Sequence, residues 1–146
     1  MASSSQATFT PAASSHTTPA VFGGAQEFKS LGQVGSMVSI LGCSLRIDGS
    51  TETTTWTLHL YDQTPPSALA DAASFSIASG DRGNYLGNIS LAQVVVFGAS
   101  CWIENNNIWK PVRLRSSSLF AYLVNGTTVT PAAVAHVVTI GTEYIG

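Results

Sequence analysis

The chain has 146 residues, a net charge of −2 and only 10% charged residues, against a usual share of about 25%. This length suits one domain that buries a sizeable core. The small negative charge argues against a nucleic-acid partner, because phosphate binding needs a concentrated positive field. A surface so poor in charge does little to repel other copies, so we expect protein to cover much of it in the working state.

Residues 1–26 contain no Asp, Glu, Lys or Arg and are rich in Ser, Thr, Ala and Pro. Such a segment cannot by itself bury enough apolar surface to offset the entropy of ordering. Two interpretations stay open: a disordered tail, or an extended arm that orders on a partner through Phe9, Val21 and Phe22. The sequence therefore divides into a low-complexity N-terminal arm over residues 1–26 and a β-domain over residues 27–146.

Alternating apolar and polar residues predict the strands of this domain. Residues 56–61 show the pattern most clearly, and the tandem prolines that follow cannot continue a strand. The apolar run 93–97 is typical of a buried strand, and the Asn125-Gly126 pair predicts a hairpin that returns over residues 127–130. Further strands are expected over 37–48, 85–91, 100–104, 108–114, 119–124 and 134–140.

These strands are short, turns follow every 8–12 residues or so, and no convincing long helix is visible. The fold class that this pattern predicts is all-β, an antiparallel β-sandwich with an extended N-terminal arm. A jelly roll is the commonest way to arrange eight such strands, so the sandwich is expected to be jelly-roll-like.

The residues that often carry catalysis or bind metals form no motif here. His59 and Asp62 are three apart on a strand and would lie on opposite faces. Asp62, Asp71 and Asp81 lack the spacing of a metal-binding loop. His136 lies in an apolar strand, where a hydrogen-bonded structural role is expected. We therefore expect no enzyme, no cofactor and no metal.

Cys43 and Cys101 are too few for a disulfide framework and lie in apolar runs, so we expect buried, reduced thiols. A bond between them becomes possible if their strands are neighbours and the medium oxidises. The N-terminus lacks the features of a secretory signal, and no stretch reaches the roughly 18 apolar residues of a membrane span. The sequence thus predicts a soluble protein that is made in a cytoplasm, with no membrane partner.

The aromatic residues Trp102, Trp109, Phe120 and Tyr122 allow two interpretations. They form either a sugar-stacking platform, as in β-sandwich lectins, or parts of the core and of a subunit interface. Because both faces of the strand that carries Phe120 and Tyr122 are apolar, a central buried strand or one covered by a neighbouring subunit is favoured. We take Trp102, Trp109 and Tyr122 as the candidate subunit contacts.

Four runs carry a family resemblance: LHLYDQTPPSALADAASFSI, then GDRGNYLGNISL, then KPVRLRSSSLFAYLV, and a TPAA segment before the last strand. Together with the start TFTPAASSHTTPAVFGGA, they resemble small virion proteins of tailed bacteriophages, the head decoration or cement proteins. The resemblance covers most of the chain. It implies a trimeric β-sandwich, often a jelly roll, that sits at local threefold positions outside the icosahedral shell and clamps neighbouring subunits of the major capsid protein.

On this hypothesis the arm residues Phe9, Val21 and Phe22 contact the capsid, and other copies of the chain complete a homotrimer. The protein is then made in the host cytoplasm and located on the outer surface of the capsid. An alternative is a receptor- or carbohydrate-binding module of a phage fibre or tail, for which Trp109 beside residues 105–107 offers a suitable loop. A minor head-closure or tail-tube component is a third possibility.

Overall fold

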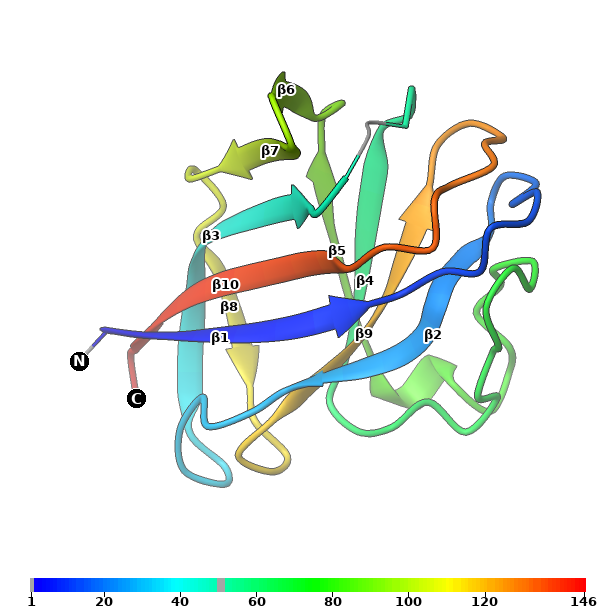
Figure 1. Ribbon diagram of the computed structural model, residues 1–146. Helices are drawn as coiled ribbons and strands as arrows, with labels where there is room; N and C mark the ends of the chain where they lie inside the picture. Colours follow the sequence, from blue (N-terminus) through cyan, green and yellow to red (C-terminus); the bar gives the residue numbers. More distant parts are fainter. Residues whose placement is uncertain (1, 50–51) are drawn as a thin grey trace.

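The computed structural model describes residues 2–49 and 52–146, which form two antiparallel sheets packed face to face (Figure 1). The predicted all-β antiparallel sandwich is confirmed. The first sheet has the order β1 (Ala2–Phe9), β10 (His136–Tyr144), β3 (Met37–Ile47), β7 (Ser100–Asn105) and β6 (Val95–Phe97), and β8 (Lys110–Arg113) pairs with the other half of β3. The second sheet has the order β2 (Val21–Phe28), β9 (Leu119–Asn125), β4 (Trp56–Tyr61) and β5 (Tyr85–Leu91), and a 3-10 turn, η1 (Arg82–Asn84), precedes β5.

The strands pair as nested partners from the two ends of the chain inward. β1 pairs with β10, β2 with β9, β3 with β7 and β8, and β4 with β5. Successive pairs lie in alternate sheets, so the chain winds like one long hairpin rolled around the core. We interpret this winding as that of a jelly roll, with β6 as an additional strand at one edge.

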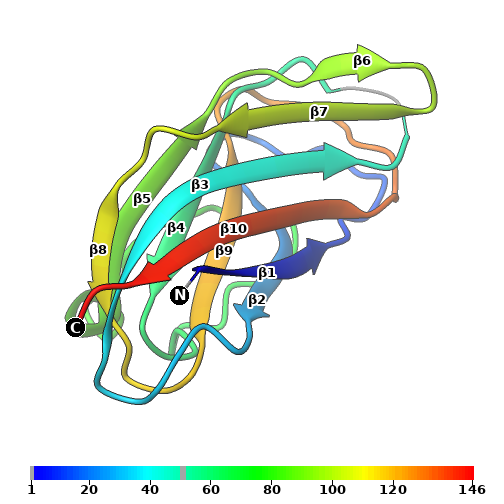
Figure 2. The ribbon, with the colours of Figure 1, turned by 90° about the vertical axis from the view of Figure 1, so that its left-hand side faces the viewer.

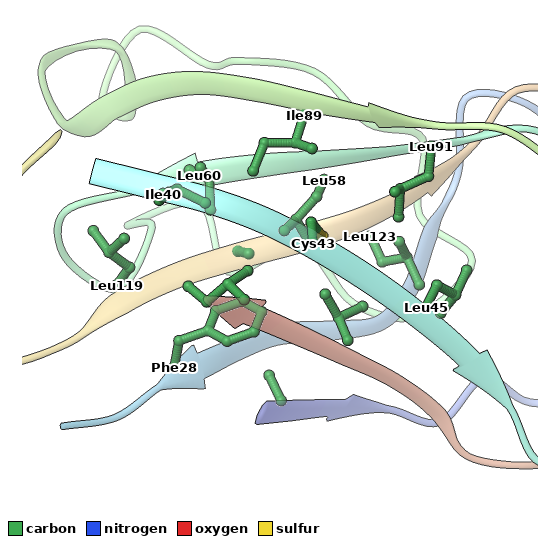
Figure 3. Packing of buried hydrophobic residues seen from close by; sticks show 14 of the residues in the cluster. Phe28, Ile40, Cys43, Leu45, Leu58, Leu60, Ile89, Leu91, Leu119 and Leu123 are labelled. Atoms are coloured by element: carbon green, nitrogen blue, oxygen red, sulfur yellow. The ribbon is translucent and has the colours of Figure 1, made fainter. Parts of the chain in front are cut away.

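The core fills the space between the two sheets. On β4 the side chains of Trp56, Leu58 and Leu60 are buried, whereas those of the intervening residues Thr57 and His59 are partly exposed. This is the period-two pattern that the sequence shows, because successive side chains on a strand point to opposite faces. Figure 3 shows the core side chains of both sheets meeting; those labelled include Phe28, Ile40, Leu45, Leu119 and Leu123.

The N-terminal segment differs from its prediction as a separate arm. β1 pairs with β10 along its whole length, and β2 runs without a break through the expected boundary between residues 26 and 27. Phe9, Val21 and Phe22 have no exposed surface. The prediction counted only the apolar surface within the segment, whereas the sandwich supplies the missing partners from distant strands. In this fold these three side chains are not free to contact a capsid.

The hairpin predicted around Asn125 is wrong. Its side chain accepts a hydrogen bond from the Ala20 backbone N–H at 2.8 Å and donates one to the His16 carbonyl at 2.9 Å. Val129 then forms an isolated bridge with His16. No strand returns along β9, because β9 already has β2 on one side and β4 on the other.

Replacing Phe22 with alanine should lower the free energy of unfolding by about 3–5 kcal/mol, since it leaves a cavity in the core. The Phe22 ring packs against Trp56, with centroids 4.9 Å apart. Denaturant unfolding followed by tryptophan fluorescence measures the change. Val34→Ala, at a side chain that is 71% exposed, is the control and should cost about 0.5 kcal/mol or less.

A chain that lacks residues 1–25 loses β1 and most of β2, so we expect it not to fold. A cooperative unfolding transition in this truncated chain would contradict the assignment of these residues to the sandwich.

Candidate interaction surface

An edge hairpin carries a cluster of exposed apolar side chains. The β6 residues Val95, Val96 and Phe97 are 51%, 54% and 65% exposed, at the end of the first sheet (Figure 2). Trp102, which lies opposite Val95 on β7, is 36% exposed. We term these four residues the β6 surface.

The prediction of a buried strand over residues 93–97 is wrong for β6 itself, since only Val94 of this run is buried. Within the described chain β6 pairs with β7 alone, so its outer edge presents unpaired backbone N–H and C=O groups. Edge strands are usually protected by charged side chains, yet residues 83–103 contain none. The exposed edge is therefore suited to contact with another protein.

A neutralised ion pair borders the β6 surface. The guanidinium of Arg46 lies 5.8 Å from the centre of the Trp102 ring, and its Nε donates to Asp48 Oδ1 at 2.6 Å. Asp48 thus balances the cation on its own strand side, so the surface has no strong net charge next to it. An approaching partner meets mainly apolar atoms here.

A second uncharged surface lies where the chain ends. It is a groove of about 450 Å³ at the start of β3, and the side chain of Tyr144 in its wall is 59% exposed. Val34 and Ile145, next to groove residues in the sequence, are exposed as well. We term this the chain-end groove; its lining residues are Ser3, Ser30, Leu31, Gly32, Gln33 and Tyr144.

The three predicted subunit contacts do not form one surface. Trp102 belongs to the β6 surface, whereas Trp109 is 62% exposed in the segment before β8. Tyr122 is fully buried: its hydroxyl accepts a hydrogen bond from the Leu69 N–H at 2.9 Å, and its ring packs against Tyr61. The prediction for Tyr122 therefore fails, because its apolar face serves a second small cluster within the chain.

Two buried histidines pair with carboxylates. His136 Nε2 lies 3.1 Å from Glu52 Oε1 and its Nδ1 lies 2.9 Å from the Val134 carbonyl, which confirms the structural role expected for His136. His16 Nε2 lies 2.9 Å from Asp71 Oδ1. The paired residues are 84 and 55 positions apart in the sequence, so no local pattern announces either pair.

Asp71 is the hydrogen-bonding centre of the segments before β2 and after β4. It accepts from the backbone N–H groups of Ala12 and Gly23 as well as pairing with His16. Burial alone would raise the pKa of Asp71, but these hydrogen bonds and the histidine lower it overall. The carboxylate therefore stays charged and keeps both segments in place.

The other candidate carboxylates have separate structural tasks. Asp81 accepts hydrogen bonds from the Ser67 N–H and hydroxyl, and the Asp62 N–H donates to the Asn84 carbonyl at 3.0 Å. Over residues 2–49 and 52–146 no group of three or more His, Cys, Asp or Glu side chains is arranged to hold a metal ion. In the same part of the chain no helix has the length and apolar character needed to cross a membrane.

Cys43 and Cys101 are both buried and free, as expected. Their strands are neighbours, but Cys43 lies opposite Asn105 whereas Cys101 lies opposite Ile47. Four residues of ladder separate the two thiols, about 13 Å along the strands, which is too far for a bond. Burial raises the pKa of Cys43 to about 12, so its thiol carries little thiolate at neutral pH.

No protein-family model and no curated protein matches the sequence. Among solved structures, a chain of the cyanophage Pam1 capsid asymmetric unit is similar with 13% identity and a TM-score of 0.37, over 99% of this chain and 85% of that chain. A chain of Desmodium yellow mottle tymovirus has 11% identity and a TM-score of 0.29, over 100% and 83%. The VP2 subviral particle of infectious bursal disease virus has 14% and 0.34, over 98% and 37%. All three come from virus particles, but TM-scores below 0.5 carry no argument about function.

His59 should make the protein less stable in mild acid. Its ring stacks on Phe75 with centroids 3.9 Å apart, and burial lowers its pKa from 6.5 to about 4. Below about pH 6.5 the unfolded chain binds a proton at His59, whereas the folded chain does not until about pH 4. Stability therefore falls as the pH falls through this window.

The variant His59→Gln removes this titration and should show a smaller loss of unfolding free energy between pH 7.5 and pH 4.5 than the wild type. Urea unfolding at both pH values measures the two losses, and the remaining titrating groups are common to both proteins. Equal losses in the two proteins would contradict the assignment.

Proposed function

We propose that this protein is a structural virion protein that decorates and stabilises the outside of a bacteriophage capsid by binding between major capsid protein subunits. The observation that carries the proposal is the open apolar edge of β6, with three neighbouring side chains more than half exposed. Soluble monomers rarely leave such an edge without protecting charges. The resemblance of the sequence to head decoration proteins supports the same conclusion.

In this role the protein acts as a homotrimer at local threefold positions on the outer surface of the shell, after synthesis in the host cytoplasm. The mechanism is binding alone. Three linked copies engage the shell together, so a weak contact from each copy gives slow release of the whole. Because the trimer binds the assembled shell and not the free capsid subunits, its binding free energy stabilises the shell by mass action.

The fold limits where the shell contact lies. Since the first 26 residues are part of the sandwich, contact with the shell comes from a folded surface and not from a projecting arm. A rigid sandwich whose two terminal strands pair with each other also gives up little conformational entropy on binding. Both properties suit a protein that clamps a preformed lattice.

The proposal predicts that the purified protein pellets with empty shells that lack it and saturates at a high, fixed number of copies per shell. The bound shells should then withstand higher temperatures before they release or unfold their subunits. Quantitative co-sedimentation and a thermal melt of the shells measure these effects. Binding of only a few copies per particle, or none, would contradict the proposal.

The alternative is a receptor- or carbohydrate-binding module, and one observation favours it. Trp109 is exposed directly after three asparagines, and the Asn106 amide donates to Glu104 at 3.0 Å, so an aromatic face and fixed polar groups occur in one loop. A glycan screen tests it, with Trp109→Ala as the control. A glycan that binds the wild type and not the variant would favour this alternative.

A further inference from the structure

The β6 surface and the chain-end groove lie at opposite ends of the same long strand. β7, which carries β6, pairs with residues 43–47 of β3. At the other end of β3, the Met37 N–H donates to the Gly146 carbonyl at 2.6 Å, next to the groove residue Tyr144. β3 has 11 residues, so its ends are about 33 Å apart. A single copy therefore cannot bring its own two surfaces together (Figure 2).

The two surfaces differ in shape. Val95 and Phe97 share one face of β6 and Val96 lies on the other, yet all three are more than half exposed. The hairpin thus projects beyond the core as an apolar knob. The chain-end groove holds about 450 Å³, the volume of roughly fifteen water molecules, which is ample for one phenyl ring.

The two surfaces are also compatible in charge. Residues 83–103 carry no charge, and none of the six residues that line the groove is charged. The chain as a whole has a net charge of −2, so copies repel one another only weakly. Apolar contact between copies is therefore not opposed by buried or repelling charges.

We propose that the β6 surface of one copy docks into the chain-end groove of the next copy, with Phe97 entering the groove beside Tyr144. This is a heterologous, head-to-tail contact. Such contacts form a ring when the rotation between copies closes, and, resting on the proposed function, three of them close the homotrimer. Each copy then gives its knob to one neighbour and its groove to the other.

A second copy fits these surfaces better than another partner, because each copy brings both halves of the contact. A two-fold contact of β6 with β6 would leave the groove uncovered. A ring with an odd number of copies also requires contacts between two different surfaces. The head-to-tail contact satisfies both requirements with the residues that the fold already exposes.

The test is the mass of the purified protein and of variants at matched concentrations, measured by sedimentation equilibrium. Wild type should have three times the chain mass of 15.2 kDa. Phe97→Ser, which lacks the knob, and Tyr144→Lys, which places a charge in the groove, should each have the mass of one copy. Trp109→Ser is the matched control, an exposed aromatic in neither surface, and should keep the wild-type mass.

Mixing the variants separates a head-to-tail contact from a two-fold one. Phe97→Ser keeps an intact groove and Tyr144→Lys keeps an intact knob, so an equimolar mixture should form a species of two copies. A mixture that stays at one copy, a wild type of one copy, or single variants with the wild-type mass would each overturn the contact. Val96→Lys and Gln33→Lys replace either variant that lacks a cooperative unfolding transition.

The shell assay is read separately from the solution mass. A wild-type trimer that fails to pellet with shells would overturn the proposed function and leave the head-to-tail contact standing. A wild-type protein of one copy that still pellets at high copy number would overturn the contact and leave decoration standing.

Discussion

Pairing of the two ends of the chain is the constraint on which the rest of the structure depends. β1 lies against β10 in an unbroken antiparallel register from Ala2 opposite Glu143 to Phe9 opposite His136, and every other pair nests inside this one. The first segment of the chain thereby supplies a strand to each sheet and buries Phe9 and Phe22 between them. Without these strands the core would be open along one side. The histidine pairs add to the same closure, since His16 binds Asp71 across it and contacts the Phe22 ring.

The sequence predicts the strands whose two faces differ, and it fails where the deciding contact is distant. Alternation in β3 and β4 is visible because one face of each meets the core, and Pro111 correctly marks β8 as an edge strand that pairs with β3 alone. The role of residues 2–9 depends on a partner more than a hundred positions away, which no local pattern reveals. The Asn125-Gly126 pair suits a tight hairpin, but a strand with neighbours on both sides has no room for the returning strand.

The candidate site shows the same limit. Trp102 is found by its residue type, but Tyr122 and the three arm residues are equally typical of interfaces and of cores, and the structure places all four in the interior. The run from Val94 to Phe97 is the opposite case. An apolar run has the same composition whether the second sheet covers it or not, so its exposure follows only from the position of β6 at an unpaired edge. That exposure, combined with the absence of charge over residues 83–103, gives the molecule its clearest surface for contact with protein.

The central claim is that copies of this protein cover the outside of a capsid. The most direct measurement is an image reconstruction of empty shells, lacking the protein, before and after they are incubated with it. The account predicts added density on the outer surface, in groups of three sandwiches at the local threefold positions. Unchanged shells, or density confined to a single vertex or to the tail, would contradict it.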